Sequence, residues 1–76
     1  MPTLLFEQGF KFFFYANDHE PAHVHVLKGD AWAKIEIATL IVVNSTFKQQ
    51  ELKMCLALVA AHQAEFQEKW NEWFNR

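Results

Sequence analysis

The chain has 76 residues, of which 51% are hydrophobic and 16% aromatic, and its formal net charge is −2. This charge argues against a broad basic surface for nucleic acid, although a small local patch would suffice for a transient substrate. The length predicts one domain over residues 1–76, in which folding buries only about 60% of the surface that the unfolded chain exposes. So large an apolar content should leave apolar surface exposed, which favours self-association or a protein partner.

The single cysteine, Cys55, cannot form an internal disulfide, and we expect it to be a small buried apolar side chain. The first seven residues lack a basic segment followed by a long apolar core. No apolar run reaches the roughly 20 residues that a membrane-spanning helix needs. We therefore expect a cytoplasmic protein without membrane association.

The first half of the chain predicts antiparallel strands joined by tight turns. Residues 3–6 are apolar, and Gln8-Gly9 is typical of a turn. The aromatic run at 10–15 predicts a strand in which alternate phenylalanines share one face. Residues 32–37 alternate between the two faces of the clearest strand, and 40–43 are a candidate short strand.

The segment 23–27 alternates polar and apolar residues, so its valines should face the core and its two histidines the exposed polar face. A turn at Gly29-Asp30 would place His25 opposite Lys34 and His23 opposite Glu36. Directly opposed side chains have Cβ atoms about 4.5–5.5 Å apart. A slip of one residue would instead place apolar residues opposite both histidines.

The second half of the chain predicts helix, because residues 47–76 contain neither glycine nor proline. Thr46 and Gln49 are spaced as a capping box. Apolar residues follow helical spacing at Leu52, Cys55, Leu56, Val59, Phe66, Trp70, Trp73 and Phe74. One helix of about 40 Å would be long for this domain, so we expect a bend or break near 62–64. The predicted fold class is α+β, with an antiparallel sheet of three to five strands and then one kinked helix or two helices.

The segment 17–26 concentrates the chemically active side chains, with three of the four histidines and two carboxylates. Asn17, Asp18 and Pro21 favour a turn, so we expect Asp18 and His19 in a loop beside the strand histidines. The other histidine, His62, lies on the predicted helix and is expected to be surface or packing.

The order of these features resembles a known family of short bacterial proteins. The resemblance covers Gly9-Phe10 with its aromatic run, the box DHEPAHVHV at 18–26, Ala33-Lys34-Ile35, Glu51-Leu52 and Trp70. These motifs are similar to domain-of-unknown-function family 4160 over essentially the whole chain. Members of that family often have proline where this chain has Ala22.

The resemblance implies a setting more than an activity. It identifies Asp18, His19, His23 and His25 as the polar residues of the motif and assigns none of them a role. It also implies operons that look like toxin–antitoxin modules, often with a gene for another small domain. A small partner protein encoded nearby is therefore expected, a homo-oligomer being the other expectation.

One hypothesis for the site is acid–base catalysis. Imidazole titrates near neutral pH, so two histidines can accept and donate a proton as a metal-independent ribonuclease requires, with RNA as substrate. A lysine would stabilise the phosphate charge, and a carboxylate would orient an imidazole. The candidate catalytic residues are Asp18, His19, His23 and His25, with support from Lys34 or Lys28 and from Glu36.

A second hypothesis is a metal site. Two histidines at i and i+2 of a strand point the same way and can share a divalent ion such as zinc. His19 or Asp18 would supply a third ligand to His23 and His25, and Glu36 a fourth.

A third hypothesis is a non-catalytic binding module, similar to an antitoxin. The loop carboxylate and imidazole would then cap backbone donors, and the strand histidines would cover an exposed face of the sheet. Trp70, Trp73 and Phe74 are expected in the core or in a dimer seam. Trp32 is expected on the face that carries His25, where it would border the site or stack on a ligand.

Overall fold

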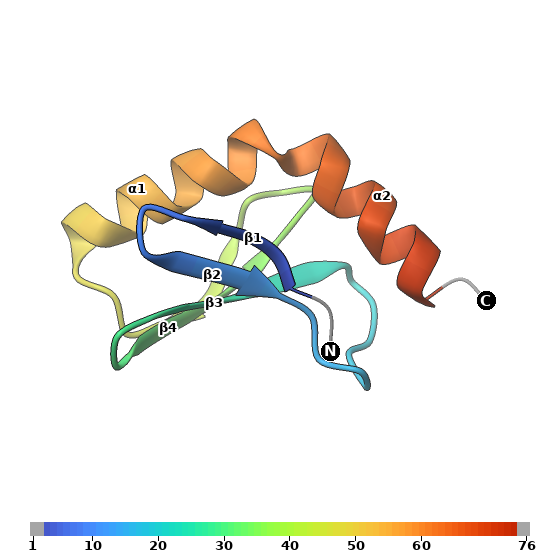
Figure 1. Ribbon diagram of the computed structural model, residues 1–76, viewed down its shortest axis with the longest axis horizontal. Helices are drawn as coiled ribbons and strands as arrows, with labels where there is room; N and C mark the ends of the chain where they lie inside the picture. The colour runs from blue at the N-terminus through green and yellow to red at the C-terminus, as the bar shows by residue number, and fades with distance from the viewer. Residues whose placement is uncertain (1–2, 75–76) are drawn as a thin grey trace.

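Five antiparallel strands pair in their order along the chain, and two helices lie across one face of the sheet (Figure 1). The computed structural model describes residues 3–74. The elements are β1 (Thr3–Glu7), β2 (Phe10–Phe13), β3 (His23–Lys28), β4 (Ala31–Glu36), β5 (Val42–Ser45), α1 (Gln49–Ala61) and α2 (Gln63–Phe74). The predicted α+β class is confirmed, with a sheet of five strands and two helices rather than one.

Two-residue turns form both tight hairpins of the sheet. Gln8 and Gly9 have φ angles of 54° and 83°, the left-handed values that a two-residue turn between antiparallel strands favours. Gly29 has a φ angle of 60° in the turn between β3 and β4. The register that follows from this second turn is confirmed, since His23 pairs with Glu36 and His25 with Lys34.

The core lies between the sheet and the two helices. Alternate residues of β2, β3 and β4 point toward the helices, as the period of a strand requires. The buried side chains contributed by the sheet and its loops include Phe10, Phe12, Phe14, Val24, Val26, Ala33, Ile35 and Ile37. The helices contribute Cys55, Leu58, Val59, Phe66 and Trp70. Burial raises the pKa of the Cys55 thiol to about 12, as expected for a packed apolar side chain.

Neither helix lies across the opposite face of the sheet, although the Trp70 side chain of α2 reaches His23 at its edge (Figure 1). We call this face of the sheet the open face. The strand residues that alternate with the core set lie on it: Phe6, Lys11, Phe13, His23, His25, Leu27, Trp32, Lys34, Glu36 and Asn44. Any site built on the strand histidines therefore belongs to the open face.

The predicted helix break is confirmed at His62. The backbone there has φ −111° and ψ 17°, outside the α region, and its N–H contacts the carbonyls of both Leu58 and Val59. Gln63, the first residue of α2, donates from its side-chain amide to the Ile37 carbonyl at 2.6 Å. The break lets α1 and α2 follow the curvature of the sheet in one arc (Figure 1).

Two local predictions are wrong. The helix begins after Lys48, which makes no side-chain capping bond, so Thr46 and Gln49 form no capping box. Thr46 instead pairs with Trp32 of β4. Its hydroxyl oxygen accepts a hydrogen bond from the Trp32 N–H at 2.9 Å, and its backbone N–H donates to the Trp32 carbonyl at 2.8 Å. The last strand runs over Val42–Ser45 instead of 40–43. It starts later because Leu40 has a φ angle of 61° and donates its N–H to the Glu36 carbonyl at 3.0 Å, in the turn that follows β4.

The aromatic strand is also shorter than predicted. It ends at Phe13 instead of residue 15, because the Tyr15 N–H bonds to the Asp18 carboxylate and not to a neighbouring strand.

Shortening Ile35 to valine is expected to lower the free energy of unfolding by about 0.5–1.5 kcal/mol, because its side chain is fully buried. The matched control is Ile41→Val, which makes the same change at a side chain that is 54% exposed. It should change stability by less than about 0.5 kcal/mol. Urea unfolding curves measure both variants, and equal losses would contradict this position of the core.

Candidate functional site

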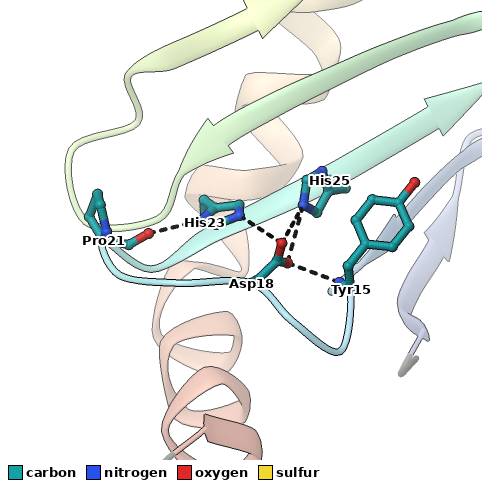
Figure 2. A network of polar contacts seen from close by, with 5 residues as sticks. All are labelled: Tyr15, Asp18, Pro21, His23 and His25. Atoms are coloured by element: carbon teal, nitrogen blue, oxygen red, sulfur yellow. Dashed lines mark hydrogen bonds and ion pairs between the residues drawn. The ribbon is translucent and has the colours of Figure 1, made fainter.

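The loop between β2 and β3 brings the Asp18 carboxylate against the histidines of β3. Both oxygens of Asp18 lie 3.1 Å from Nε2 of His25 (Figure 2). The Tyr15 N–H donates to Asp18 Oδ2 at 2.9 Å, and the Asp18 N–H donates to the Tyr15 carbonyl at 3.2 Å. These two bonds close the turn 15–18 and hold the carboxylate in place, as aspartate in a turn commonly does.

Only one of the two ring nitrogens of His23 has a hydrogen-bond partner within residues 3–74. Its Nδ1 lies 2.8 Å from the carbonyl of Pro21, which can only accept, so Nδ1 carries the proton (Figure 2). In the neutral form of the ring, Nε2 then presents a lone pair. This atom lies 3.3 Å from Asp18 Oδ1, but it is buried and has no hydrogen-bond partner within residues 3–74. The short distance therefore records proximity of two groups without a hydrogen bond between them.

The expectation that both strand histidines are exposed is wrong. His23 is only 4% exposed, because the indole of Trp70 from α2 lies against it with the ring centroids 5.3 Å apart. The same indole donates its N–H to the Glu20 carboxylate at 3.0 Å, which ties α2 to the loop. His25 is partly buried between Phe13, on which it stacks, and Tyr15.

The electrostatics of the cluster favour an ionised carboxylate beside a neutral imidazole. Burial is the largest influence on Asp18 and by itself would raise its pKa. The hydrogen bonds from His25 and the Tyr15 amide, helped by the electrostatic attraction between the carboxylate and the two imidazole rings, outweigh burial and lower the pKa below 3.8. Burial, together with the nearby His23 and Lys34, lowers the pKa of His25 below 6.5 and outweighs the opposing hydrogen bond and charge of Asp18. Both pKa shifts favour the unprotonated side chains of Asp18 and His25, which are the forms that bind metal ions.

Of the residues expected at the site, the structure brings three together. One donor atom each from Asp18, His23 and His25 lies within 4.8 Å of the others, and we call these residues the Asp-His-His cluster. His19 is exposed and lies outside this cluster. Lys28 is also outside it, since its ammonium pairs with Glu51 of α1 at 2.8 Å.

A polar hollow of about 410 Å³ adjoins the cluster. It is lined by Asn17, Asp18, His19, Glu20, Pro21, His23, Lys34, Glu36 and Val43. Lys34 therefore remains beside the site as predicted. Glu36 accepts a hydrogen bond from the Thr39 hydroxyl at 2.9 Å, and the carboxylate that orients an imidazole is Asp18.

An aromatic hollow of about 360 Å³ lies on the open face on the other side of His25. Its walls are Phe13, Tyr15, His25, Val26, Leu27, Trp32 and Ala33. Trp32 was expected to border the site, and it lines this hollow. His25 belongs both to the Asp-His-His cluster and to the wall of the aromatic hollow.

Two contributors to the site were missed by sequence reasoning. The carbonyl of Pro21 sets the tautomer of His23, and a backbone acceptor leaves no trace in residue type. Trp70 was expected in the core or in a dimer seam, and it lies in the core, but it also covers His23. No local pattern indicates that contact, because Trp70 lies near the other end of the chain.

The fold and the cluster together define a small α+β domain with an Asp-His-His constellation on the open face of its sheet. The chain belongs to the family described as Domain of unknown function (DUF4160), whose model matches residues 9–71. The resemblance noted from the histidine-rich box is thereby confirmed. Searches of curated proteins and of solved structures found no match. Within residues 3–74, no helix is long and apolar enough to cross a membrane.

Acidification is expected to destabilise the protein, beginning below about pH 6.5. The lowered pKa of His25 means that the unfolded chain binds this proton first, so stability is lost as pH falls from 6.5 toward the folded pKa. The lowered pKa of Asp18 adds a second loss below 3.8, in the same direction. Urea unfolding with a chelator present, from about pH 7.5 to about pH 2.5, measures the dependence.

The variant His25→Gln should flatten the dependence just below pH 6.5, whereas His19→Gln, an exposed change outside the cluster, is the matched control. An unchanged slope in His25→Gln, or greater stability on acidification, would contradict the assignment.

Proposed function

We propose that this domain binds a divalent transition-metal ion, zinc being the one that best suits its donors, through Asp18, His23 and His25. The observation that carries the proposal is the buried Nε2 of His23. This atom has no hydrogen-bond partner among residues 3–74, and it lies 3.3 Å from a carboxylate oxygen of Asp18. A lone pair that faces an anionic oxygen is repelled by it. A cation between the two atoms would turn this repulsion into attraction.

The hydrogen bond on the other side of His23 supports the same proposal. Histidines that bind metals almost always donate their second ring N–H to a carbonyl, carboxylate or water, which fixes the tautomer. His23 makes this bond to Pro21 at 2.8 Å. A buried polar atom without a partner costs about 1–3 kcal/mol, so its presence calls for a reason.

The spacing of the donors also suits a metal. Zinc bonds of about 2.0–2.1 Å in a tetrahedron separate neighbouring ligand atoms by about 3.3 Å. Asp18 Oδ1 lies 3.3 Å from Nε2 of His23 and 3.1 Å from Nε2 of His25. The ion would take the place of the proton on His25 Nε2. Because the pKa of His25 is lowered, the ring is neutral near pH 7, and this proton would move to Nδ1 without a net release. The sequence offered either His19 or Asp18 as the third ligand, and the proposed set takes Asp18 because His19 lies outside the cluster.

Zinc is expected to bind at a ratio of one ion per chain and to raise the melting temperature. At a free concentration of a hundred times the Kd, the gain is about 2.7 kcal/mol. For a domain of this size, that corresponds to roughly 10 °C or more. Isothermal titration of the chelator-treated protein gives the stoichiometry, and thermal unfolding gives the shift.

The variants Asp18→Asn, His23→Gln and His25→Gln should each lose stoichiometric binding. The matched control, His19→Gln, should keep it because His19 lies outside the cluster. Zinc binding that needs His19 but not His23 would overturn the proposed ligand set, and no binding at all would overturn the proposed function.

A second candidate is the acid–base chemistry of a ribonuclease, and the pairing of Asp18 with His25 favours it. A carboxylate that holds one imidazole nitrogen leaves the other free to exchange protons with a substrate. His23 is poorly suited to this role, because it is buried and its Nδ1 bonds to Pro21. His25 would then be the single acid–base residue, with Lys34 beside it.

Expression of an active ribonuclease is expected to arrest growth, and His25→Gln should relieve the arrest at unchanged protein level. His19→Gln is again the control, since it alters an exposed imidazole of the same box. If growth arrest persists in His25→Gln, His25 is not the acid–base residue.

The toxin–antitoxin setting, the cytoplasmic location and an RNA substrate stay predictions, as do a small partner protein and a homo-oligomer. Exposed apolar side chains support a partner, including Phe6, Leu27, Trp32 and Ile41. Repeating the growth assay with the neighbouring gene present or absent tests whether this chain acts as the toxin or the antidote.

A further inference from the structure

We infer that the aromatic hollow beside the Asp-His-His cluster binds the base of a nucleotide, whose phosphate reaches the metal and Lys34. The inference rests on the proposed metal site for the phosphate. It rests independently on the aromatic walls for the base, which lets the two parts be tested apart.

The aromatic hollow has the surfaces that a nucleobase needs. Tyr15 and Trp32 line it and are 44% and 40% exposed, so both aromatic residues can contact a ligand. Phe13, Leu27 and His25 complete an apolar wall. Stacking on aromatic side chains tolerates every base, because each base has a π face. The volume of about 360 Å³ lies within the range of small-molecule sites.

The aromatic hollow and the metal ligands share His25. Its ring lies in the wall of the aromatic hollow, while its Nε2 faces Asp18 in the wall of the polar hollow. A ligand with its ring beside Tyr15 is therefore next to the cluster, since the Tyr15 and His25 ring centroids are 4.5 Å apart. Lys34, opposite His25 in the neighbouring strand, lines the polar hollow and would face the phosphate.

The charges of the polar hollow make phosphate binding depend on the metal. Its lining includes the carboxylates of Asp18, Glu20 and Glu36 but one ammonium, that of Lys34. Without a metal ion this excess of negative charge repels a phosphate. A divalent cation would balance the excess and offer the phosphate oxygens a direct partner. The base, held on apolar walls, should bind with or without the ion.

A phosphorylated ligand explains both hollows better than an apolar protein segment does. A protein segment would fill the aromatic walls but leave the adjoining lysine and metal ligands without a partner. The same chemistry occurs in a free nucleotide and at the phosphorylated end of a single strand, and the experiment separates these two sources.

The test follows the indole N–H resonance of Trp32 by NMR during titrations with adenosine, adenosine monophosphate and inorganic phosphate, each with and without zinc. Adenosine should shift the resonance equally in both conditions. Adenosine monophosphate should bind at least about tenfold more tightly when zinc is present. A short 5′-phosphorylated single strand that binds more tightly than the monophosphate identifies a strand end as the source, and equal binding identifies the free nucleotide.

Two variants separate the parts. Trp32→Ala lacks the reporter resonance, so its affinities are measured by isothermal titration against those of the unaltered protein. The change should weaken binding of adenosine and of the monophosphate at least about fivefold and leave zinc binding unchanged, since Trp32 is not a metal ligand. Phe6→Ala, which removes an exposed aromatic ring from the same face outside the hollow, is the matched control.

The inference is overturned if zinc binds, the monophosphate leaves the Trp32 resonance unshifted, and Trp32→Ala leaves the affinity for the monophosphate unchanged. The proposed metal site stands in that case. If zinc does not bind but adenosine still shifts Trp32, the metal site fails and phosphate recognition with it, while the base site is supported.

Discussion

The antiparallel pairing of β3 with β4 is the constraint on which both the core and the site depend. The turn at Gly29 sets Val24 opposite Ile35 and His25 opposite Lys34. Every second side chain of the two strands then packs under the helices, and the side chains between them lie on the open face. A shift of one residue would exchange the faces, burying the imidazoles and exposing the valines. The same register therefore builds the apolar core and the polar surface.

The strand alone does not make the site, because three parts of the fold contribute to it. The sheet aims His23 and His25 in one direction, and the turn 15–18 adds the carboxylate of Asp18. Helix α2 adds Trp70, which covers His23 and bonds to the loop. Covering the cluster removes it from water, which strengthens every interaction within it and makes an unpaired polar atom costly.

The unpartnered nitrogen of His23 is where stability and function diverge. A core designed only for stability would give this atom a partner or replace it with an apolar group, as most buried polar groups are satisfied. Natural proteins depart from such rules mainly at functional sites. Here the unpartnered nitrogen of His23 lies close to the carboxylate of Asp18 and the imidazole of His25, and one cation could bind all three groups.

The sequence by itself determined the α+β class, the helix break near His62 and which residues share a face in the three central strands, because these follow from local periodicity and turn chemistry. It also located the histidine-rich box. Only the tertiary structure decided that Thr46 pairs with a strand, that Trp70 buries His23 and that Asp18 rather than His19 joins the cluster. Each of these outcomes depends on contacts between residues or turn geometry that local residue types do not encode.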